Sequence, residues 1–412
     1  MHFKLNTQHI DKTFWALFIT LVVVAIIALF SASSTLVYMR NSAIGPVMQQ
    51  MLYIGLGLIA AYVIQFVPSM WVRVGGYGLL GVSTLCLYIM LIPHNPFVVT
   101  INGAGRWFNL FGFVFQPSEL AKLALIIVIA DQLARIRSEE EKKKLFYRTL
   151  LITCITVLPI LTGNLSTALL LFGIVFLMWF MARIPWQYLC ATVAVAVVAL
   201  MLGYVIVEFG FVRPHRKLPI LPRAVTWVGR IDDMFSKKDK DAEFKLTGDN
   251  YQASLAKVAI ARGGKSPIGV LPGNSTERDY LPLAFADYIF AIIVEETGII
   301  GAGFLIFLYL AILFRACWTS NRYDDYAAML MVMGLALMIT CQALISMMVA
   351  VGLGPVTGQP LPLVSRGGTS VLITSIYFGI MLCVSREQTE LKSKQDVVRA
   401  ESMDDVPDII LE

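Results

Sequence analysis

The feature that most constrains this chain is a series of long, nearly uncharged apolar runs that recurs along almost its whole length. Hydrophobic residues make up 57% of the 412 residues and charged residues only 15%, so the chain cannot cover itself with a water-compatible surface. A helix needs roughly 20 apolar residues to cross a bilayer. We therefore predict an all-α, polytopic membrane protein with about ten transmembrane helices, which excludes a soluble enzyme and a single-anchor receptor. The runs are Phe14–Phe30, Met51–Val67, Val74–Ile92, Leu120–Leu133, Leu150–Leu161, Ala168–Phe180, Tyr188–Val207, Asp287–Phe314, Ala327–Val349 and Ser370–Val384.

The even number of runs places both chain ends on one side of the membrane. The connections on that side hold most of the basic residues, with a concentration at 135–148, so the positive-inside rule predicts cytoplasmic termini. We expect a cytoplasmic segment at 1–13 and a helical bundle at 14–385. One long extracytoplasmic loop, about 210–286, joins the seventh and eighth helices, and 386–412 is predicted to be a solvated, disordered cytoplasmic tail.

Within the long loop, Tyr251, Leu255 and Val258 recur at helical spacing before Gly263 and Gly264. Paired glycines after an apolar repeat are typical of a helix end followed by a turn. The pattern predicts a short helix lying on the membrane surface, and an amphipathic stretch that binds nothing explains it equally well.

Several functional classes are disfavoured by composition. The net charge of +5 is too small an excess to suggest nucleic acid, and the six cysteines fall in or beside apolar runs without a Cys-x-x-Cys pair. The four histidines are scattered, without the spacing that a metal site or a hydrolase triad needs. We predict no metal site and no required cofactor, and leave a divalent cation open.

The first cluster of polar residues lies before and at the start of the fourth run. Gly103-Ala-Gly-Arg106-Trp107 is followed by Gln116-Pro-Ser-Glu-Leu-Ala-Lys122. Pro117 suits the first position of a helix, and Glu119 and Lys122, three residues apart, share a face. A structural ion pair between Glu119 and Lys122 is as reasonable as a binding site.

The second cluster begins the eighth run. Asp287 would sit at the outer membrane edge, in a partly dry setting that raises a carboxyl pKa toward the range of a general base. A helix cap is the alternative role for Asp287. We interpret Glu295 and Glu296, about two turns deeper, as structural residues that pair with buried partners.

The third cluster, residues 352–370, packs prolines and glycines between the last two runs. Irregular backbone at membrane depth is tolerated only where it is buried in protein or lines a cavity. We expect it to line a cavity, and a rigid hairpin that closes the bundle is the alternative.

These motifs resemble, in order and spacing, the SEDS family of bacterial shape and division proteins. The resemblance covers nearly the whole chain, and its loops are more similar to the division branch, FtsW, than to the elongation branch, RodA. It rests on Gly-Ala-Gly-Arg106-Trp107, Gln116-Pro-Ser-Glu-Leu-Ala-Lys122, Tyr251-Gln252 through Gly263-Gly264, Leu281-Pro282 through Gly298, and Pro355-Val-Thr-Gly-Gln-Pro-Leu-Pro-Leu-Val-Ser-Arg-Gly-Gly-Thr-Ser370.

The chain departs from the family pattern at several positions, among them Leu283, Phe285 and Ala286 just before Asp287. Asn164-Leu-Ser-Thr167 stands where the family often has Asp-Leu-Gly-Thr. The aspartate and the Arg-Trp and Gln-Pro-Ser-Glu elements match the family. The departures therefore concern the roles of the residues that flank Asp287.

The resemblance implies a peptidoglycan glycosyltransferase that polymerises lipid II at the outer face of the bacterial cytoplasmic (inner) membrane during cell division. Asp287 is then the expected general base, because an inverting transfer from a lipid diphosphate requires only one base. The expected substrate-binding residues are Arg106, Glu119, Lys122, Lys257, Arg262, Ser365 and Ser370.

The resemblance further implies a class B penicillin-binding protein, a transpeptidase, as partner, together with other membrane proteins of the division machinery. Three alternatives remain at this stage. The chain could be a transporter that flips the lipid-linked precursor, an elongation rather than a division enzyme, or a non-catalytic scaffold.

Overall fold

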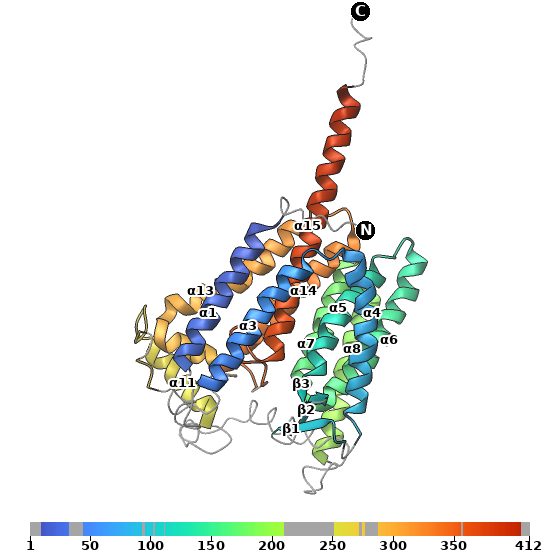
Figure 1. Ribbon diagram of the computed structural model, residues 1–412. Helices are drawn as coiled ribbons and strands as arrows, with labels where there is room; N and C mark the ends of the chain where they lie inside the picture. The colour runs from blue at the N-terminus through green and yellow to red at the C-terminus, as the bar shows by residue number, and fades with distance from the viewer. Residues whose placement is uncertain are drawn as a thin grey trace, which may run out of the picture.

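Figure 1 shows the computed structural model, a bundle of long helices. The ten predicted runs all fall in observed helices, which confirms the all-α polytopic fold. Those helices are α1 (Lys12–Ala32), α3 (Ile44–Ile64), α4 (Ser69–Ile89), α5 (Pro117–Leu133), α6 (Glu139–Gly163), α7 (Leu165–Met181), α8 (Trp186–Val207), α13 (Ile289–Ser320), α14 (Tyr326–Ala350) and α15 (Thr369–Asp404). The structure describes residues 10–32, 44–92, 95–101, 104–110, 112–209, 251–271, 274–276, 287–355 and 357–404.

Short polar side chains and one proline set where several helices begin. Asp11 accepts hydrogen bonds from the first backbone amides of α1, and Ser138 caps α6. Asn164 caps α7 and Asp325 caps α14 in the same way, while Pro117 occupies the first turn of α5. Each cap satisfies amides that have no partner within the helix, so these starts are encoded locally.

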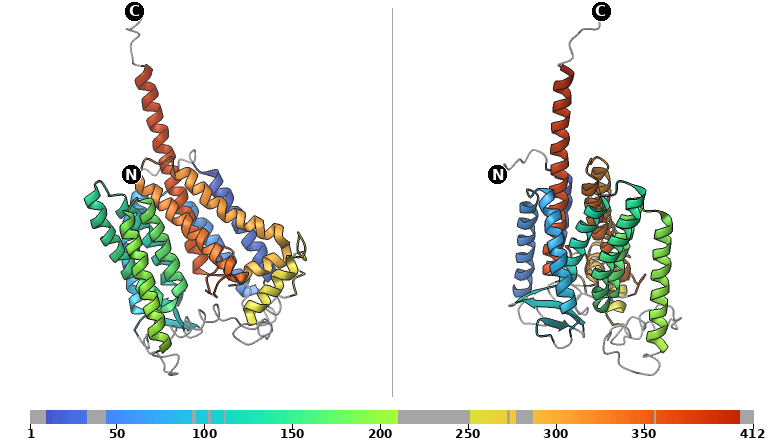
Figure 2. Two further views of the ribbon diagram at one scale, coloured as in Figure 1. Left: turned by 180° about the vertical axis from the view of Figure 1, so that it is seen from behind. Right: turned by 90° about the vertical axis from the view of Figure 1, so that its right-hand side faces the viewer.

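Helices α5 and α14 form the centre of the bundle. Nearly every side chain of α5 is buried, and α14 packs against α5, α7, α13 and α15. By length and composition, eight of the described helices could each cross a membrane, and α7 is a shorter apolar helix. Helix α5 carries Glu119 and Lys122, and its enclosure by neighbours keeps both away from lipid. Helix α8 stands at the periphery (Figure 2), with Leu189 as its buried residue.

A small antiparallel sheet precedes α5, and the sequence analysis did not predict it. Strands β1 (Val98–Ile101), β2 (Ala104–Leu110) and β3 (Phe113–Phe115) pair in the order β1-β2-β3, with Ile101 opposite Ala104. The sheet lies at the end of the bundle where α4 ends and α5 begins (Figure 1). It carries Arg106 on its central strand.

The described part of the long loop contains the predicted helix, α11 (Tyr251–Gly263). Its boundaries confirm the helix expected before the glycine pair, and small residues form its contact face. Ala256, Ala259 and Gly263 are buried against α13, whereas Val258 is exposed. Small residues occupy this face because the backbones of α11 and α13 approach each other closely. A Cβ on Gly263 would lie 2.1 Å from the Val294 carbonyl oxygen.

Helix α13 is interrupted at Gly298, which has φ 65° and ψ −159°. The interruption leaves carbonyls without helical partners, and the segment after α11 supplies them: the amide of Val270 donates to the Glu295 carbonyl and that of Leu271 to the Glu296 carbonyl. The long loop is thereby fastened to α13. The rest of the predicted loop at 210–250, 272–273 and 277–286 lies outside the described residues.

Helix α15 runs beyond the predicted membrane span. The segment from Arg386 was expected to be an irregular tail, yet it continues the helix to Asp404. Glu390 accounts for part of this, because it pairs with Arg386 and Lys394 at i,i+4 spacing (3.9 and 3.0 Å). An existing helix also needs no new nucleation to grow.

The beginning of α1 and the later part of α15 meet at one end of the bundle. Ser385 Oγ of α15 donates a hydrogen bond to Asp11 Oδ2, 3.1 Å away. We call this the terminal end. The sheet and α11 lie at the opposite end (Figure 1).

Candidate active site

Asp287 and Arg106 meet beside a glycine of the third sequence cluster. A Cβ built on Gly358 would lie 3.6 Å from Arg106 Nη1 and 3.8 Å from Asp287 Oδ2. Gly358 has φ 61°, a conformation that favours glycine, and a larger side chain there would enter the space next to both charged groups. We call these three residues the Gly358 cluster. It brings together a carboxylate and a guanidinium that are 181 positions apart in sequence.

Asp287 directly precedes α13 and is half-buried. The residue in the capping position of α13 is Tyr288, without a side-chain cap, so the structure does not use Asp287 as the helix cap that the sequence allowed. A carboxylate next to a guanidinium in a partly desolvated setting can accept a proton or stabilise a neighbouring cation.

Arg106 is positioned by the central strand of the sheet. Its Nε donates to the carbonyl oxygen of Gly163 at the end of α6, 3.4 Å away, so β2 is linked to the turn between α6 and α7. A cavity of about 50 Å³ beside it is also lined by Gln116 and Ser118 at the start of α5 and by Asn164. Three of the motifs recognised in the sequence therefore meet around Arg106.

The loop that carries Gly358 spans residues 351–368 apart from Val356, and its part from 357 to 368 is buried or half-buried, whereas Gly352, Leu353 and Pro355 are exposed. Tyr309 of α13 donates from its hydroxyl to the Pro362 carbonyl (2.6 Å). Leu363 is 2% exposed and has φ 64°, which for a non-glycine residue costs roughly 1–2 kcal/mol. Packing and hydrogen bonds must therefore hold the loop in one conformation. Its burial satisfies the condition for irregular backbone inside a membrane protein.

Glu119 and Lys122 form the ion pair that their spacing indicated, with Lys122 Nζ 2.7 Å from Glu119 Oε1. Lys122 is 1% exposed and also donates to Gln342 Oε1 of α14 (3.0 Å), while Gln342 Nε2 donates to the Pro360 carbonyl (3.0 Å). This chain of contacts ties α5 and α14 to the 351–368 loop. This geometry matches the structural ion pair that was the alternative to a binding site. Lys122 therefore helps to fix the position of the loop.

The remaining expected substrate residues lie on α11, in the 351–368 loop and at the start of α15. Lys257 of α11 is exposed, and its Nζ lies 3.3 Å from where a Cβ on Gly352 would be. Arg262 faces Glu295 Oε1 at 3.7 Å. Ser365 is 1% exposed and its Oγ accepts from the Leu361 amide (2.8 Å). Ser370 is buried in the first turn of α15.

Glu295 and Glu296 have the structural partners that the sequence analysis expected. Ser275 Oγ donates to the carboxylate of Glu295, which is fully buried, and the Thr276 amide donates to it at 3.3 Å. Ser31 of α1 donates to Glu296. These contacts hold the segment after α11 against α13, and with it Lys257.

Within the ranges that the structure describes, no three His, Cys, Asp or Glu side chains are placed to hold a metal ion. The question of a divalent cation stays as the sequence analysis left it.

Comparison with known proteins then places the chain. The profile of a family described as "Cell cycle protein", which comprises FtsW, RodA and SpoVE, matches residues 11–390. The chain belongs to the FtsW/RodA/SpoVE family. This is the SEDS family that the motifs resembled.

Two relatives carry the name of a peptidoglycan glycosyltransferase. A protein of Enterococcus hirae named "Probable peptidoglycan glycosyltransferase FtsW" is 32% identical, over 95% of this chain and 96% of its own length. Peptidoglycan glycosyltransferase MrdB of Escherichia coli K12 is 27% identical, over 91% and 93%.

Solved structures of family members share the fold. A chain from work on the structural coordination of polymerization and crosslinking by a peptidoglycan synthase complex superposes with a TM-score of 0.69 and 27% identity, covering 92% of this chain and 99% of that one. RodA of Thermus thermophilus, with a TM-score of 0.64, 24% identity and coverage of 93% and 99%, shows the same fold.

Sequence reasoning missed two features that build the site. The sheet that presents Arg106 was signalled by Asn102-Gly103 between runs of β-branched and aromatic residues, a frequent hairpin sequence. Gln342 looked like one more residue of an apolar run. Only its three-dimensional position between Lys122 and Pro360 shows that it supports the loop.

Proposed function

We propose that this chain is a peptidoglycan glycosyltransferase that polymerises lipid II into β-1,4 glycan strands. The donor sugar is attached through its anomeric carbon to a lipid diphosphate, and the acceptor is the 4-hydroxyl of a GlcNAc. Asp287 takes the proton of that hydroxyl as its oxygen attacks the anomeric carbon. The bond to the diphosphate breaks in the same step, and the diphosphate leaves with the electron pair.

One carboxylate suffices for this chemistry. An α-linked donor that gives a β-linked product inverts its configuration, as direct attack by an activated hydroxyl does. A diphosphate leaves readily once its charge is compensated, so no acid is required on the leaving side. Arg106 supplies that compensation, because a guanidinium binds phosphate oxygens through two parallel hydrogen bonds.

The observation that carries the proposal is the convergence of Asp287 and Arg106 on Gly358 in a member of this family. The base acts on the attacking hydroxyl oxygen, and the cation acts on the leaving diphosphate. Both oxygens are at the donor's anomeric carbon, so the base and the cation have to lie near that carbon and therefore near each other. The supporting contacts from Lys122 through Gln342 to the loop hold that arrangement in place.

We place the reaction at the outer face of the bacterial cytoplasmic membrane. Arg135 and Arg137 of the α5–α6 connection, and Lys143 near the start of α6, lie at the terminal end, away from the Gly358 cluster. The positive-inside rule makes the terminal end cytoplasmic, with both chain termini inside.

We assign the enzyme to cell division, with a class B penicillin-binding protein as its cross-linking partner. The FtsW relative is more similar to this chain than MrdB is (32% against 27% identity). The similar solved chain belongs to a complex described as coordinating polymerization with crosslinking. Other membrane proteins of the division machinery and lipid II complete the expected set of partners.

The experiment is synthesis of glycan polymer from lipid II by the purified protein, followed on gels, alone and with its transpeptidase partner. Wild-type protein should make polymer and Asp287→Asn should make none, since the amide cannot accept the proton. Asp324→Asn, an equivalent change at an exposed position of the terminal end, is the matched control and should keep full activity.

Polymer made by Asp287→Asn would remove Asp287 from the mechanism. Wild-type protein that makes no polymer but moves lipid II between vesicle leaflets would identify a transporter. Unchanged thermal unfolding of Asp287→Asn is required before a loss of polymer is assigned to the missing base.

A further inference from the structure

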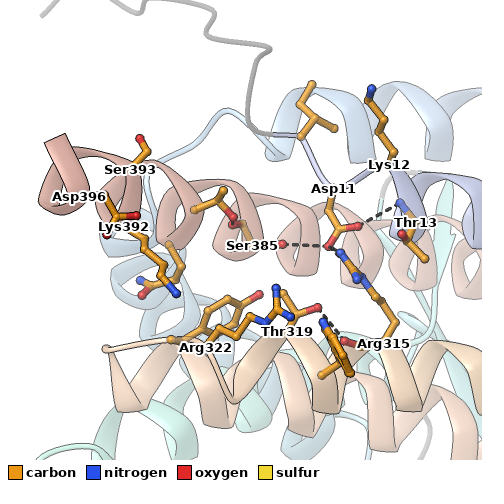
Figure 3. Close-up of a pocket in the computed structure, with 15 residues that line it drawn as sticks. Asp11, Lys12, Thr13, Arg315, Thr319, Arg322, Ser385, Lys392, Ser393 and Asp396 are labelled. Carbon is orange, nitrogen blue, oxygen red and sulfur yellow. Dashed lines mark hydrogen bonds and ion pairs between the residues drawn. The ribbon is translucent and has the colours of Figure 1, made fainter. Parts of the chain in front are cut away.

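A second cavity among the described residues lies at the terminal end, remote from the Gly358 cluster. It has a volume of about 520 Å³ and is formed where the start of α1, the end of α13 and the later part of α15 come together (Figure 3). We call it the terminal-end pocket. Its lining includes Asp11, Lys12, Arg315, Arg322, Lys392 and Asp396.

The acidic residue at the centre of this pocket is fully engaged. Asp11 Oδ2 accepts hydrogen bonds from Arg315 Nη2 (2.8 Å) and Ser385 Oγ (3.1 Å). Asp11 Oδ1 accepts from the amides of Thr13 and Phe14 at the start of α1 (3.0 and 3.2 Å). Arg315 and the amides at the start of α1 therefore compensate its negative charge (Figure 3). It is not available to the other cations of the pocket.

Besides the Asp11–Arg315 pair, the lining holds three cations and one acid. Within the part of the chain that the structure describes, Lys12, Arg322 and Lys392 form no ion pair. They come from three different elements and line the same cavity. Asp396 is the only other acid of the lining. Burial raises the pKa of the Tyr323 phenol, which stays protonated and adds no negative charge.

The lining of the pocket includes an aromatic side chain at the end of a candidate membrane span. The Arg322 guanidinium lies over the Trp318 ring, 4.8 Å from its centroid, and Trp318 is 50% exposed in the last turn of α13. Exposed tryptophan at the end of a membrane span is typical of the headgroup region. A cation held there by an aromatic ring is positioned at the depth of lipid phosphates.

We propose that the terminal-end pocket binds a phosphate group, carried by an anionic lipid headgroup or by a soluble phosphate compound. Arg322, Lys12 and Lys392 neutralise the phosphate, and the volume of about 520 Å³ accommodates a glycerol headgroup besides it. The lipid is the favoured source, because the exposed Trp318 lies next to Arg322 at the end of a candidate membrane span, where tryptophan is typical of the headgroup region.

The test measures ligand retention by the full-length purified protein with native mass spectrometry. The probes are short-chain phosphatidylglycerol, the same-length phosphatidylcholine, and inorganic phosphate. The variant is Arg322→Ala with Lys392→Ala, two exposed side chains whose removal breaks no ion pair in the described structure. The control is Lys143→Ala with Lys144→Ala, which removes the same charge from exposed positions of α6 at the same end.

Wild-type protein should retain phosphatidylglycerol over phosphatidylcholine. Each cation removed should weaken retention about fivefold, so the double variant should bind at least ~10-fold more weakly, while the control changes less than about twofold. Inorganic phosphate that binds with the same dependence on Arg322 and Lys392, without retention of the lipid, would assign the site to a soluble phosphate. Equal weakening in variant and control, or equal retention of the two lipids, would overturn the proposal.

Discussion

The Gly358 cluster and the terminal-end pocket both gather charged side chains at an end of the bundle, but they hold them differently. In the Gly358 cluster, the two charges come from a strand and a turn before a helix, they meet beside a glycine of a loop, and the supporting residues are themselves fixed by hydrogen bonds. In the terminal-end pocket, the cations beyond the Asp11–Arg315 pair are long, exposed side chains at the start of α1, just after α13 and within α15.

The difference indicates two kinds of task. Groups that stabilise charge during a reaction must be oriented before the reaction starts, which requires a rigid and partly dry surrounding. Groups that only attract an anion can stay mobile and solvated, at the cost of weaker, salt-dependent binding. We expect substitutions in and under the Gly358 cluster to have large effects, and those in the pocket to have small ones.

The largest effect is expected beneath the cluster, at Lys122. Lys122→Ala leaves Glu119 buried without its partner, which should lower the free energy of unfolding by ~3–5 kcal/mol. Thermal unfolding in detergent measures this, with exposed Lys143→Ala as control. Lys122→Met combined with Glu119→Gln should recover part of the loss. A Lys122→Ala protein of full stability that fails to use the donor would return Lys122 to the substrate-binding role that the sequence suggested.

The next effect is expected within the cluster, at Arg106. Arg106→Ala should reduce use of the lipid diphosphate donor about 100-fold, corresponding to the loss of one preorganised charge contact. Arg106→Lys should keep the charge and recover only a fraction, because an ammonium lacks the two-pronged geometry. Separate variation of donor and acceptor concentration makes the measurement. Equal impairment of donor and acceptor use would mean that Arg106 supports the sheet and does not bind the donor.

A smaller effect is expected where the long loop is fastened to α13. Glu295→Gln weakens the contacts to Ser275 and Arg262, which should destabilise that attachment by about 1–3 kcal/mol. Hydrogen exchange at the amides of Val270 and Leu271 should become faster, since both donate to the interrupted helix. Exposed Glu140→Gln is the control. Unchanged exchange would show that the backbone contacts alone hold the segment.

The smallest effect concerns salt and the terminal-end pocket. Raising the salt concentration from 0.05 to 0.5 M should weaken retention of phosphatidylglycerol several-fold, because the Debye length falls from roughly 14 to 4 Å and the cations are exposed. The unfolding temperature of the protein should change little, since the Glu119–Lys122 pair is shielded from water. Salt-insensitive lipid retention would remove the electrostatic account of the pocket.

Much of the fold was predictable because the membrane demands it. A spanning segment must be helical and apolar, so the ten runs located the ten helices. The end of α11 followed from Gly263 and Gly264. Its contact face did not, because backbone approach to α13 selected Ala256 and Ala259 over the larger Val258.

The sequence predicted which residues belong to the site, but it did not predict how they are arranged in space. Family resemblance singled out Asp287 and Arg106, and the structure places both beside Gly358. The resemblance also assigned Lys122 to the site, as a substrate-binding residue. In the structure Lys122 is buried and contacts Glu119 and Gln342. Hydropathy and spacing describe one segment at a time, whereas burial depends on which segments come together.

The central claim is that Asp287 accepts the proton of the attacking hydroxyl and does little to bind the donor. The most direct measurement compares wild type and Asp287→Asn for the dissociation constant of lipid II and for the single-turnover rate of bond formation at saturating lipid II. The account predicts a rate lower by about 10²–10⁴-fold with a dissociation constant that changes less than about threefold. A variant that reacts at the wild-type rate once saturated, with the whole defect in binding, would contradict it.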